Sequence, residues 1–228
     1  MPNKYHSVFG WTDYHDIYEE AVKKYNNAAF AEIGSFQGKS AVMMGEYIKE
    51  YKKTIQLHCI DLFPEKSQLA ELTNIGAGQG EEGRIINELP DSLYNTFLNN
   101  IRRCEVDDVI TINRGCSYEK ALDYVDEFFS FVFIDAAHHK SGVLLDLNAW
   151  WPKIKTGGMM AGHDFDCPGV CEAVYEFFNP LKVEKQCQIN TMVCSDGPII
   201  MTSTKKLLRN MIMQPLLRLG HFRASRQL

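Results

Sequence analysis

The chain has 228 residues, 45% hydrophobic and 23% charged, a balance typical of one globular domain with a sizeable core. No apolar run reaches the roughly 18 residues of a membrane span, and the start lacks the apolar stretch of a signal peptide, so we expect a cytoplasmic protein. The formal charge is −5, yet every charged residue from Ser203 onward is a lysine or an arginine. The rest is therefore acidic, which argues against a broad nucleic-acid surface.

Short apolar runs alternate along the chain with segments of helical periodicity, the order expected of a parallel sheet with crossover helices. The predicted strands are Ala28–Ile33, Thr54–Ile60, Val109–Asn113, Ser130–Ile134 and Gly158–Ala161. The predicted helices are Ser40–Lys52, Ser92–Cys104, Tyr118–Phe128, Ser141–Trp151 and Val170–Phe178. This order predicts an α/β protein with a doubly wound, Rossmann-like sheet.

Two more strands are expected near Lys182–Gln188 and Thr191–Ser203, with no helix between them. Residues 1–204 would then form a single domain. Within it, Pro64–Pro90 interrupts the alternation with a glycine-rich stretch whose length is typical of a lid or a flexible insertion. Residues 205–228 mix leucines and methionines with basic residues, which predicts an amphipathic tail.

Polar residues follow the predicted strands where they end, and ligands of open parallel sheets bind at this edge. The first strand ends at Glu32 and Ile33, and the next turn contains Gly34 and Gly38, which permit a close approach to a ligand. Helix amides with Ser40 can hold a carboxylate, and Asp61 can accept both hydroxyls of a ribose. The later strands are followed by Gly115-Cys-Ser117-Tyr118, Asp135-Ala-Ala-His138 and His163-Asp164. Polar groups gathered at these strand ends favour a ligand site over isolated helix caps.

Together these motifs resemble class I S-adenosylmethionine-dependent methyltransferases. The run Glu32-Ile-Gly-Ser-Phe-Gln-Gly-Lys-Ser40 looks like motif I of that class. Asp135-Ala-Ala-His138 and the segment Asp146–Asp164 are similar to one branch, the metal-dependent macrolide-sugar O-methyltransferases and catechol O-methyltransferase. The resemblance covers about Phe30–Phe178. It implies a seven-stranded, mostly parallel sheet with an antiparallel last strand.

The resemblance also implies a role for each matched position. The turn 34–40 would contact the methionine part of S-adenosylmethionine, Asp61 its ribose, and Ser117 and Tyr118 its adenine. Asp135 would lie near the sulfonium. The positions so matched to the cofactor are Glu32, Gly34, Phe36, Gly38, Ser40, Asp61, Ser117, Tyr118 and Asp135.

A divalent metal is the second group that the resemblance implies. That branch uses the aspartate at position 135 together with an acidic pair, or Asp-Asn, after the fifth strand, and here the pair is His163-Asp164. The predicted metal ligands are therefore Asp135, His163 and Asp164. Because magnesium prefers oxygen ligands, an imidazole favours manganese, iron or zinc, or no metal at all.

His138 stands where the macrolide-sugar enzymes have a histidine base and the catechol enzymes a lysine. The sulfonium is already a strong methyl donor, so the enzyme must supply positioning and a nucleophile. His138 could take a hydroxyl proton at neutral pH, while a metal on Asp135 lowers the pKa of that hydroxyl. We therefore predict an O-methyltransferase acting on a small-molecule hydroxyl of a sugar, polyketide or other natural product, with His138 and Asp135 as catalytic residues.

Two other functions stay open at this point. A nicotinamide-dependent oxidoreductase is expected to carry a GxGxxG motif, whereas this turn contains only Gly34 and Gly38. A non-catalytic module that binds a nucleotide-type ligand would not need Asp135, His138 and Asp164 together. We expect no nucleic-acid partner, and the tail could also pack in a homo-oligomer.

Overall fold

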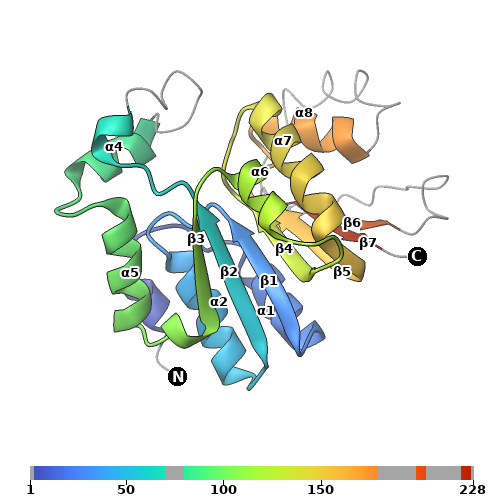
Figure 1. Ribbon diagram of the computed structural model, residues 1–228, viewed down its shortest axis with the longest axis horizontal. Coiled ribbons are helices and arrows are strands. Elements are labelled where there is room, and N and C mark those ends of the chain that lie inside the picture. The colour runs from blue at the N-terminus through green and yellow to red at the C-terminus, as the bar shows by residue number, and fades with distance from the viewer. Residues whose placement is uncertain (1–2, 70–79, 179–198, 204–221, 227–228) are drawn as a thin grey trace.

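The computed structural model describes residues 3–69, 80–178, 199–203 and 222–226. In this part of the chain, a central sheet lies between two layers of helices (Figure 1). The strand order is β3-β2-β1-β4-β5-β7-β6. No helix among the described residues is long and apolar enough to cross a membrane.

The five strands from β3 to β5 are entirely parallel, which confirms the predicted α/β, Rossmann-like fold. The bounds of these strands are β1 Ala28–Ile33, β2 Ile55–Asp61, β3 Ile110–Arg114, β4 Phe129–Ile134 and β5 Ile154–Gly162. The chain winds outward from β1 through β2 to β3 and then returns to β4 on the other side of β1. This reversal is a topological switch point, where ligands bind at the carboxyl ends of the strands.

Two further strands continue the sheet beyond β5. β7 (Phe222–Arg226) pairs antiparallel with β5, and β6 (Ile199–Ser203) pairs parallel with β7. β6 is the end of the predicted strand Thr191–Ser203, whereas the predicted strand Lys182–Gln188 lies outside the described residues. β7 comes from residues 205–228, which were predicted to form a tail.

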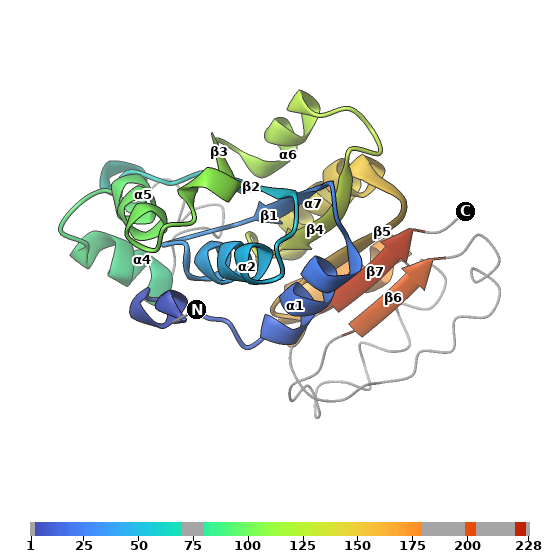
Figure 2. The same cartoon turned by 90° about the horizontal axis from the view of Figure 1, so that it is seen from below.

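Helices cover both faces of the sheet (Figure 2). One face carries α1 (His15–Lys24), α2 (Lys39–Glu50), α4 (Gly80–Glu88) and α5 (Leu93–Arg103). The other face carries α6 (Ser117–Lys120), α7 (Lys140–Trp150) and α8 (Pro168–Phe178). Successive side chains of a strand point to opposite faces, so β4 sends Phe131 and Phe133 toward α1 and α2, and Val132 and Ile134 toward α7 and α8.

The helix predicted at Tyr118–Phe128 is shorter than its sequence pattern suggests. α6 ends at Lys120 and passes into a 3₁₀ turn, Ala121–Asp123. Tyr124 leaves the helix because its ring packs 4.8 Å from Phe129 and its hydroxyl lies 3.1 Å from Nδ1 of His58. A contact with a strand distant in sequence therefore ends this helix.

Two helices lie where none was predicted. α1 precedes β1 and buries Ile17, Tyr18, Ala21 and Val22, whose spacing is helical. α4 lies inside the predicted loop Pro64–Pro90. Both helices pack against the same core as α2.

Candidate active site

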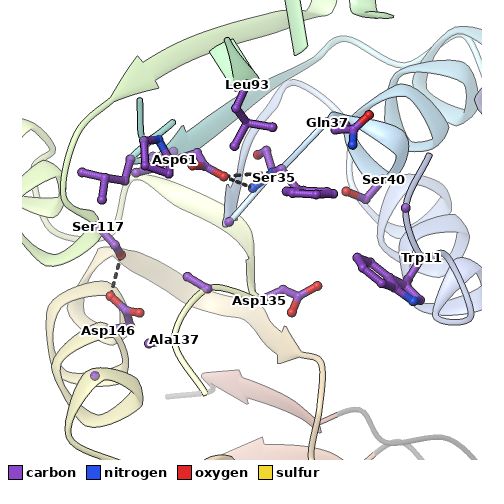
Figure 3. Close-up of a pocket in the computed structure, with 18 of the residues that line it drawn as sticks. Trp11, Ser35, Gln37, Ser40, Asp61, Leu93, Ser117, Asp135, Ala137 and Asp146 are labelled. Carbon is purple, nitrogen blue, oxygen red and sulfur yellow. Dashed lines mark hydrogen bonds between the residues drawn. The ribbon is translucent and has the colours of Figure 1, made fainter. Parts of the chain in front are cut away.

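A cavity of about 440 Å³ opens at the switch point, at the carboxyl ends of β1, β2 and β4 (Figure 3). Its walls also include the segment before α1, the first turn of α6 and the first two turns of α7. Seven large apolar side chains stay exposed in the described residues, and five of them line this cavity. These five are Phe9, Trp11, Leu62, Tyr118 and Leu145. Apolar exposure gathered in this way is typical of a ligand site.

The turn between β1 and α2 approaches the end of β4 closely enough to require glycine at position 34. Gly34 has φ +87°, and a Cβ there would overlap the carbonyl oxygen of Asp135. Gly38, with φ +88°, caps α2, and a Cβ there would lie 2.9 Å from the ring of Phe97. Gly34 therefore brings the backbone to the cavity, whereas Gly38 serves the turn and its packing and does not line the cavity.

Asp61 lines the cavity and also holds this turn in place. Its Oδ2 accepts hydrogen bonds from the backbone N–H groups of Ser35 at 2.8 Å and Phe36 at 2.9 Å. Its Oδ1 accepts from the N–H of Phe63 at 2.7 Å. Burial raises the pKa of Asp61, and these hydrogen bonds partly offset the rise. They also hold Phe36 in the left-handed region, with φ +47°.

Glu32 lies beneath the turn rather than on the cavity wall. It is 1% exposed, and its carboxylate accepts hydrogen bonds from Tyr18 at 3.1 Å and Ser35 at 3.3 Å. Burial raises its pKa to about 7. Of the residues predicted to contact the cofactor, Gly34, Phe36, Ser40, Asp61, Ser117, Tyr118 and Asp135 line the cavity.

Asp146 of α7 also lines the cavity and was not predicted as a site residue. It is 3% exposed, and its Oδ1 accepts a hydrogen bond from the Ser117 hydroxyl at 2.5 Å. Burial raises the pKa of Asp146 to about 6. A sequence signal existed, because an acid stands here on the stripe of Val143, Leu147 and Trp150, which α7 buries.

The other predicted site residues form a charged cluster beside the cavity. Nε2 of His138 lies 2.9 Å from Oδ2 of Asp164 and 3.8 Å from Oδ1 of Asp135. Nδ1 of His163 lies 3.2 Å from Oδ1 of Asp164 and 3.7 Å from Oδ1 of Asp135. Of these four, Asp135 alone lines the cavity. Asp13, which was not predicted, lies 3.2 Å from Nε2 of His163.

The carboxylates make both imidazoles cationic at neutral pH. The neighbouring carboxylates of Asp135 and Asp164 raise the pKa of His138 to about 11. Burial lowers the pKa of His163, but hydrogen bonds to Asp13 and Asp164 outweigh burial and raise this pKa to about 10. The same contacts hold the pKa of Asp164 well below its usual range against the effect of burial. The carboxylates of this cluster therefore stabilise positive charge on both imidazoles.

Donor atoms of Asp135, His138 and Asp164 lie within 4.8 Å of one another, close enough to share one metal ion. This set contains His138 in place of the predicted ligand His163. Both imidazoles face the two carboxylates, His138 through Nε2 and His163 through Nδ1, and Nε2 of His163 faces Asp13 as well.

An aromatic group forms the wall beyond Ser40. Phe9 and Trp11 lie with ring centroids 5.8 Å apart, and Trp11 lies 6.1 Å from Phe36. Nζ of Lys39 donates to the carbonyl of Gly10 at 2.9 Å, which ties this segment to the start of α2. Figure 3 shows Trp11 at one end of the cavity and Ser117 with Asp146 at the other, with Asp61 and Asp135 between them.

Comparisons with known proteins agree with this geometry. Residues 31–165, more than half of the chain, match the family described as a methyltransferase domain. No curated protein sequence matches.

Solved structures show the fold. The O-methyltransferase NovP has a TM-score of 0.60 at 14% identity, over 94% of this chain and 80% of that one. Cofactor-bound Rv0187 from MTB has a TM-score of 0.53 at 10% identity, over 75% of this chain and 70% of that one. A precorrin-6y C5,15-methyltransferase from Geobacter metallireducens GS-15 has a TM-score of 0.51 at 10% identity, over 76% and 72%.

Two alternatives were open from the sequence, a nicotinamide-dependent oxidoreductase and a non-catalytic module. The match to a methyltransferase family supports neither of them. Its range, 31–165, begins in β1 and ends just past His163 and Asp164, so it spans the motif I turn, Asp61 and Asp135. The chain therefore belongs to the methyltransferase-domain family and is a class I S-adenosylmethionine-dependent methyltransferase.

Proposed function

We propose that this enzyme transfers the methyl group to a hydroxyl oxygen of a small-molecule acceptor. In this proposal Asp135, His163 and Asp164 hold a divalent cation and His138 is the general base. The observation that carries the proposal is the position of Asp135, which lines the cavity and lies within 3.8 Å of both imidazoles. One carboxylate thus joins the cofactor site to a group that can move a proton.

The cavity matches the parts of S-adenosylmethionine in order. The start of α2 with Ser40 suits the methionine carboxylate, because helix N-terminal amides favour an anion. Asp61 suits the ribose, and Ser117 and Tyr118 suit the adenine. When bound, the cofactor supplies a sulfonium whose methyl group is already electrophilic. The residues of the chain then have to place the acceptor oxygen and remove its proton.

The charged cluster fits a divalent cation by its donor set. Two carboxylates and an imidazole make a mixed oxygen and nitrogen set, which suits manganese, iron or zinc better than magnesium. When bound, such a cation supplies a positive charge that lowers the pKa of an acceptor hydroxyl.

The two histidines differ in access, and this difference supports their separate roles. The His163 side chain is 14% exposed and is enclosed by Asp13, Asp135 and Asp164. The His138 side chain is 41% exposed and can reach an acceptor. Neutralising Asp135 and Asp164 would lower the high pKa of His138 and free its nitrogen to accept a proton.

The close grouping of Asp135, His138 and Asp164 favours a second assignment, in which His138 is the ligand and His163 the base. The two assignments differ in which histidine variant loses metal. Under the first, His163→Ala loses metal affinity and His138→Ala keeps it. Under the second, His138→Ala loses metal affinity and His163→Ala keeps it, as metal titrations would show.

The acceptor is proposed to be a sugar, polyketide or other natural-product hydroxyl. Transfer to oxygen is supported by the similarity to NovP, which is described as an O-methyltransferase. The exposed rings of Phe9 and Trp11 offer an apolar wall against which such an acceptor could pack.

The test is methyl transfer from isotope-labelled S-adenosylmethionine to a panel of sugars, polyketides and phenols. We expect an O-methyl product whose formation stops on chelation and returns with manganese, iron or zinc. A product methylated on nitrogen or carbon would overturn the choice of acceptor atom. Full activity after chelation would remove the cation while leaving His138 as a candidate base.

A further inference from the structure

Asp146 is a buried acid that the proposed chemistry does not use. It lies two turns into α7 and is 3% exposed, on the stripe that carries Val143, Leu147 and Trp150 into the core. A carboxylate in such a place costs free energy unless it is hydrogen-bonded. Yet Asp146 also lines the cavity, so one side of its carboxylate is available to a ligand.

A short relay of hydrogen bonds orients this carboxylate. Nε1 of Trp150 donates to Oγ of Ser117 at 3.0 Å. An indole N–H can only donate, so Ser117 acts as acceptor there and turns its own proton toward Asp146. Oδ1 of Asp146 accepts that proton at 2.5 Å.

The second oxygen of Asp146 remains available. Within the described part of the chain, the Ser117 hydroxyl is the one hydrogen-bond donor to this carboxylate. Oδ2 of Asp146 is also not one of the fully buried side-chain atoms that lack a hydrogen-bond partner in that part of the chain. An ionised carboxylate can only accept hydrogen bonds, so a ligand here has to present a donor.

Asp146 also lies at the correct end of the cavity to meet the adenine. With the methionine part at Ser40 and the ribose at Asp61, the base falls between Cys116, Tyr118 and Leu145, beside Ser117 and Asp146. Apolar side chains there suit the faces of a flat ring. The edge of adenine offers one exocyclic donor, the 6-amino group, among ring nitrogens that accept.

We infer that Asp146, oriented by Ser117 and Trp150, accepts a hydrogen bond from the 6-amino group of the cofactor's adenine and so determines the choice of base. The inference rests on the proposed placement of the cofactor. A base with a carbonyl at this position, such as hypoxanthine, would set its carbonyl oxygen against the Asp146 oxygen that meets the amino group of adenine.

The test compares S-adenosylhomocysteine with S-inosylhomocysteine, whose base carries a carbonyl in place of the 6-amino group and a proton on N1. Calorimetry should show the wild-type enzyme binding the adenosyl ligand about 10- to 100-fold more tightly, the size expected for a buried hydrogen bond to a charged group. Asp146→Asn keeps the side-chain shape and adds a donor that can meet the inosine carbonyl. Its preference should fall to within a few-fold or invert.

Asp123→Asn is the matched control, because Asp123 is an exposed partner of Lys120 outside the cavity. It should keep the wild-type preference. Ser117→Ala leaves the carboxylate but removes its orienting partner, so an intermediate preference is expected. Thermal unfolding of each variant checks that it is folded.

The outcomes separate the two levels of the argument. Equal affinity of the wild-type enzyme for both ligands overturns the inference and needs no variant. An unchanged preference in folded Asp146→Asn overturns it as well. Failure of the wild-type enzyme to bind either ligand would instead refute the placement of the cofactor.

Discussion

The two ends of the cavity are built in opposite ways. At the adenine end a single buried carboxylate, Asp146, is held by the neutral side chains of Ser117 and Trp150. At the reactive end, defined by Asp135, His138, His163 and Asp164, charged groups of both signs lie within 3.8 Å of one another. The first end needs no counterion, whereas the state of the second depends on protons and cations.

This comparison indicates how the enzyme divides its tasks. Recognition depends on groups whose geometry is set by packing and by neutral donors. In the proposed function, chemistry depends on groups that neutralise one another before a cation and an acceptor bind. The two ends should therefore respond separately to substitution.

The largest expected effect is at the reactive end. His138→Ala should lower kcat about 10²- to 10⁴-fold, because the acceptor loses its general base. The affinity for S-adenosylhomocysteine should stay near that of the wild type, since His138 does not line the cavity. Steady-state assays measure kcat and calorimetry measures the affinity. His15→Ala is the control, because His15 is exposed. A parallel loss of cofactor affinity would contradict the separation of the two ends.

Substitution of Asp61, which lies between the two ends of the cavity, should weaken cofactor binding. Asp61→Ala should weaken cofactor binding by about 1–3 kcal/mol, because the ribose loses its acceptor. It should also lower the free energy of unfolding, since the N–H groups of Ser35, Phe36 and Phe63 lose their partner. Asp61→Asn keeps one acceptor oxygen and should lie between the two. Wild-type affinity in a folded Asp61→Ala would remove Asp61 from the ribose site.

The aromatic wall should affect the acceptor alone. Trp11→Ala should raise the acceptor KM about 10-fold, because an apolar contact area is lost, with little change in kcat. Leu122→Ala is the matched control, because Leu122 is 81% exposed and lies outside the cavity. If KM is insensitive to Trp11→Ala, the acceptor binds elsewhere.

A further expected effect is on the free energy of unfolding, measured without added metal. The pKa of His138, about 11, and that of His163, about 10, lie above the usual value near 6.5. The folded state therefore binds these protons more tightly than the unfolded state. The stabilisation is complete below about pH 6.5 and is lost as pH rises toward the folded-state values.

Urea titrations between pH 7 and 9 should accordingly show the free energy of unfolding falling with pH. His138→Gln should fall less steeply, because one of the two titrating groups is gone, and His15→Gln should keep the wild-type slope. Equal slopes for His138→Gln and the wild type would mean that His138 keeps an ordinary pKa.

Local sequence patterns determined much of this protein. Alternation of apolar runs predicted the five parallel strands, because strand and helix periodicities are properties of neighbouring residues. Parallel strands bring their carboxyl ends to one edge, so Asp61, Ser117 and Asp135 could be placed together before any contact was known. Gly34 could be predicted for the same reason, since the turn must pass close to that edge.

Tertiary contacts decided what the sequence pattern could not. Asp61 uses its carboxylate on backbone amides of a turn about 25 residues earlier, and Asp146 is set by Ser117, 29 residues away. The approach of His138 and His163 to Asp135 and Asp164 depends on how the loops after β4 and β5 pack, and Asp13 from the segment before α1 adds a partner for His163. Hydrogen-bond partners and charge neutralisation act over a few ångströms in space, and only the folded chain brings these groups within that range.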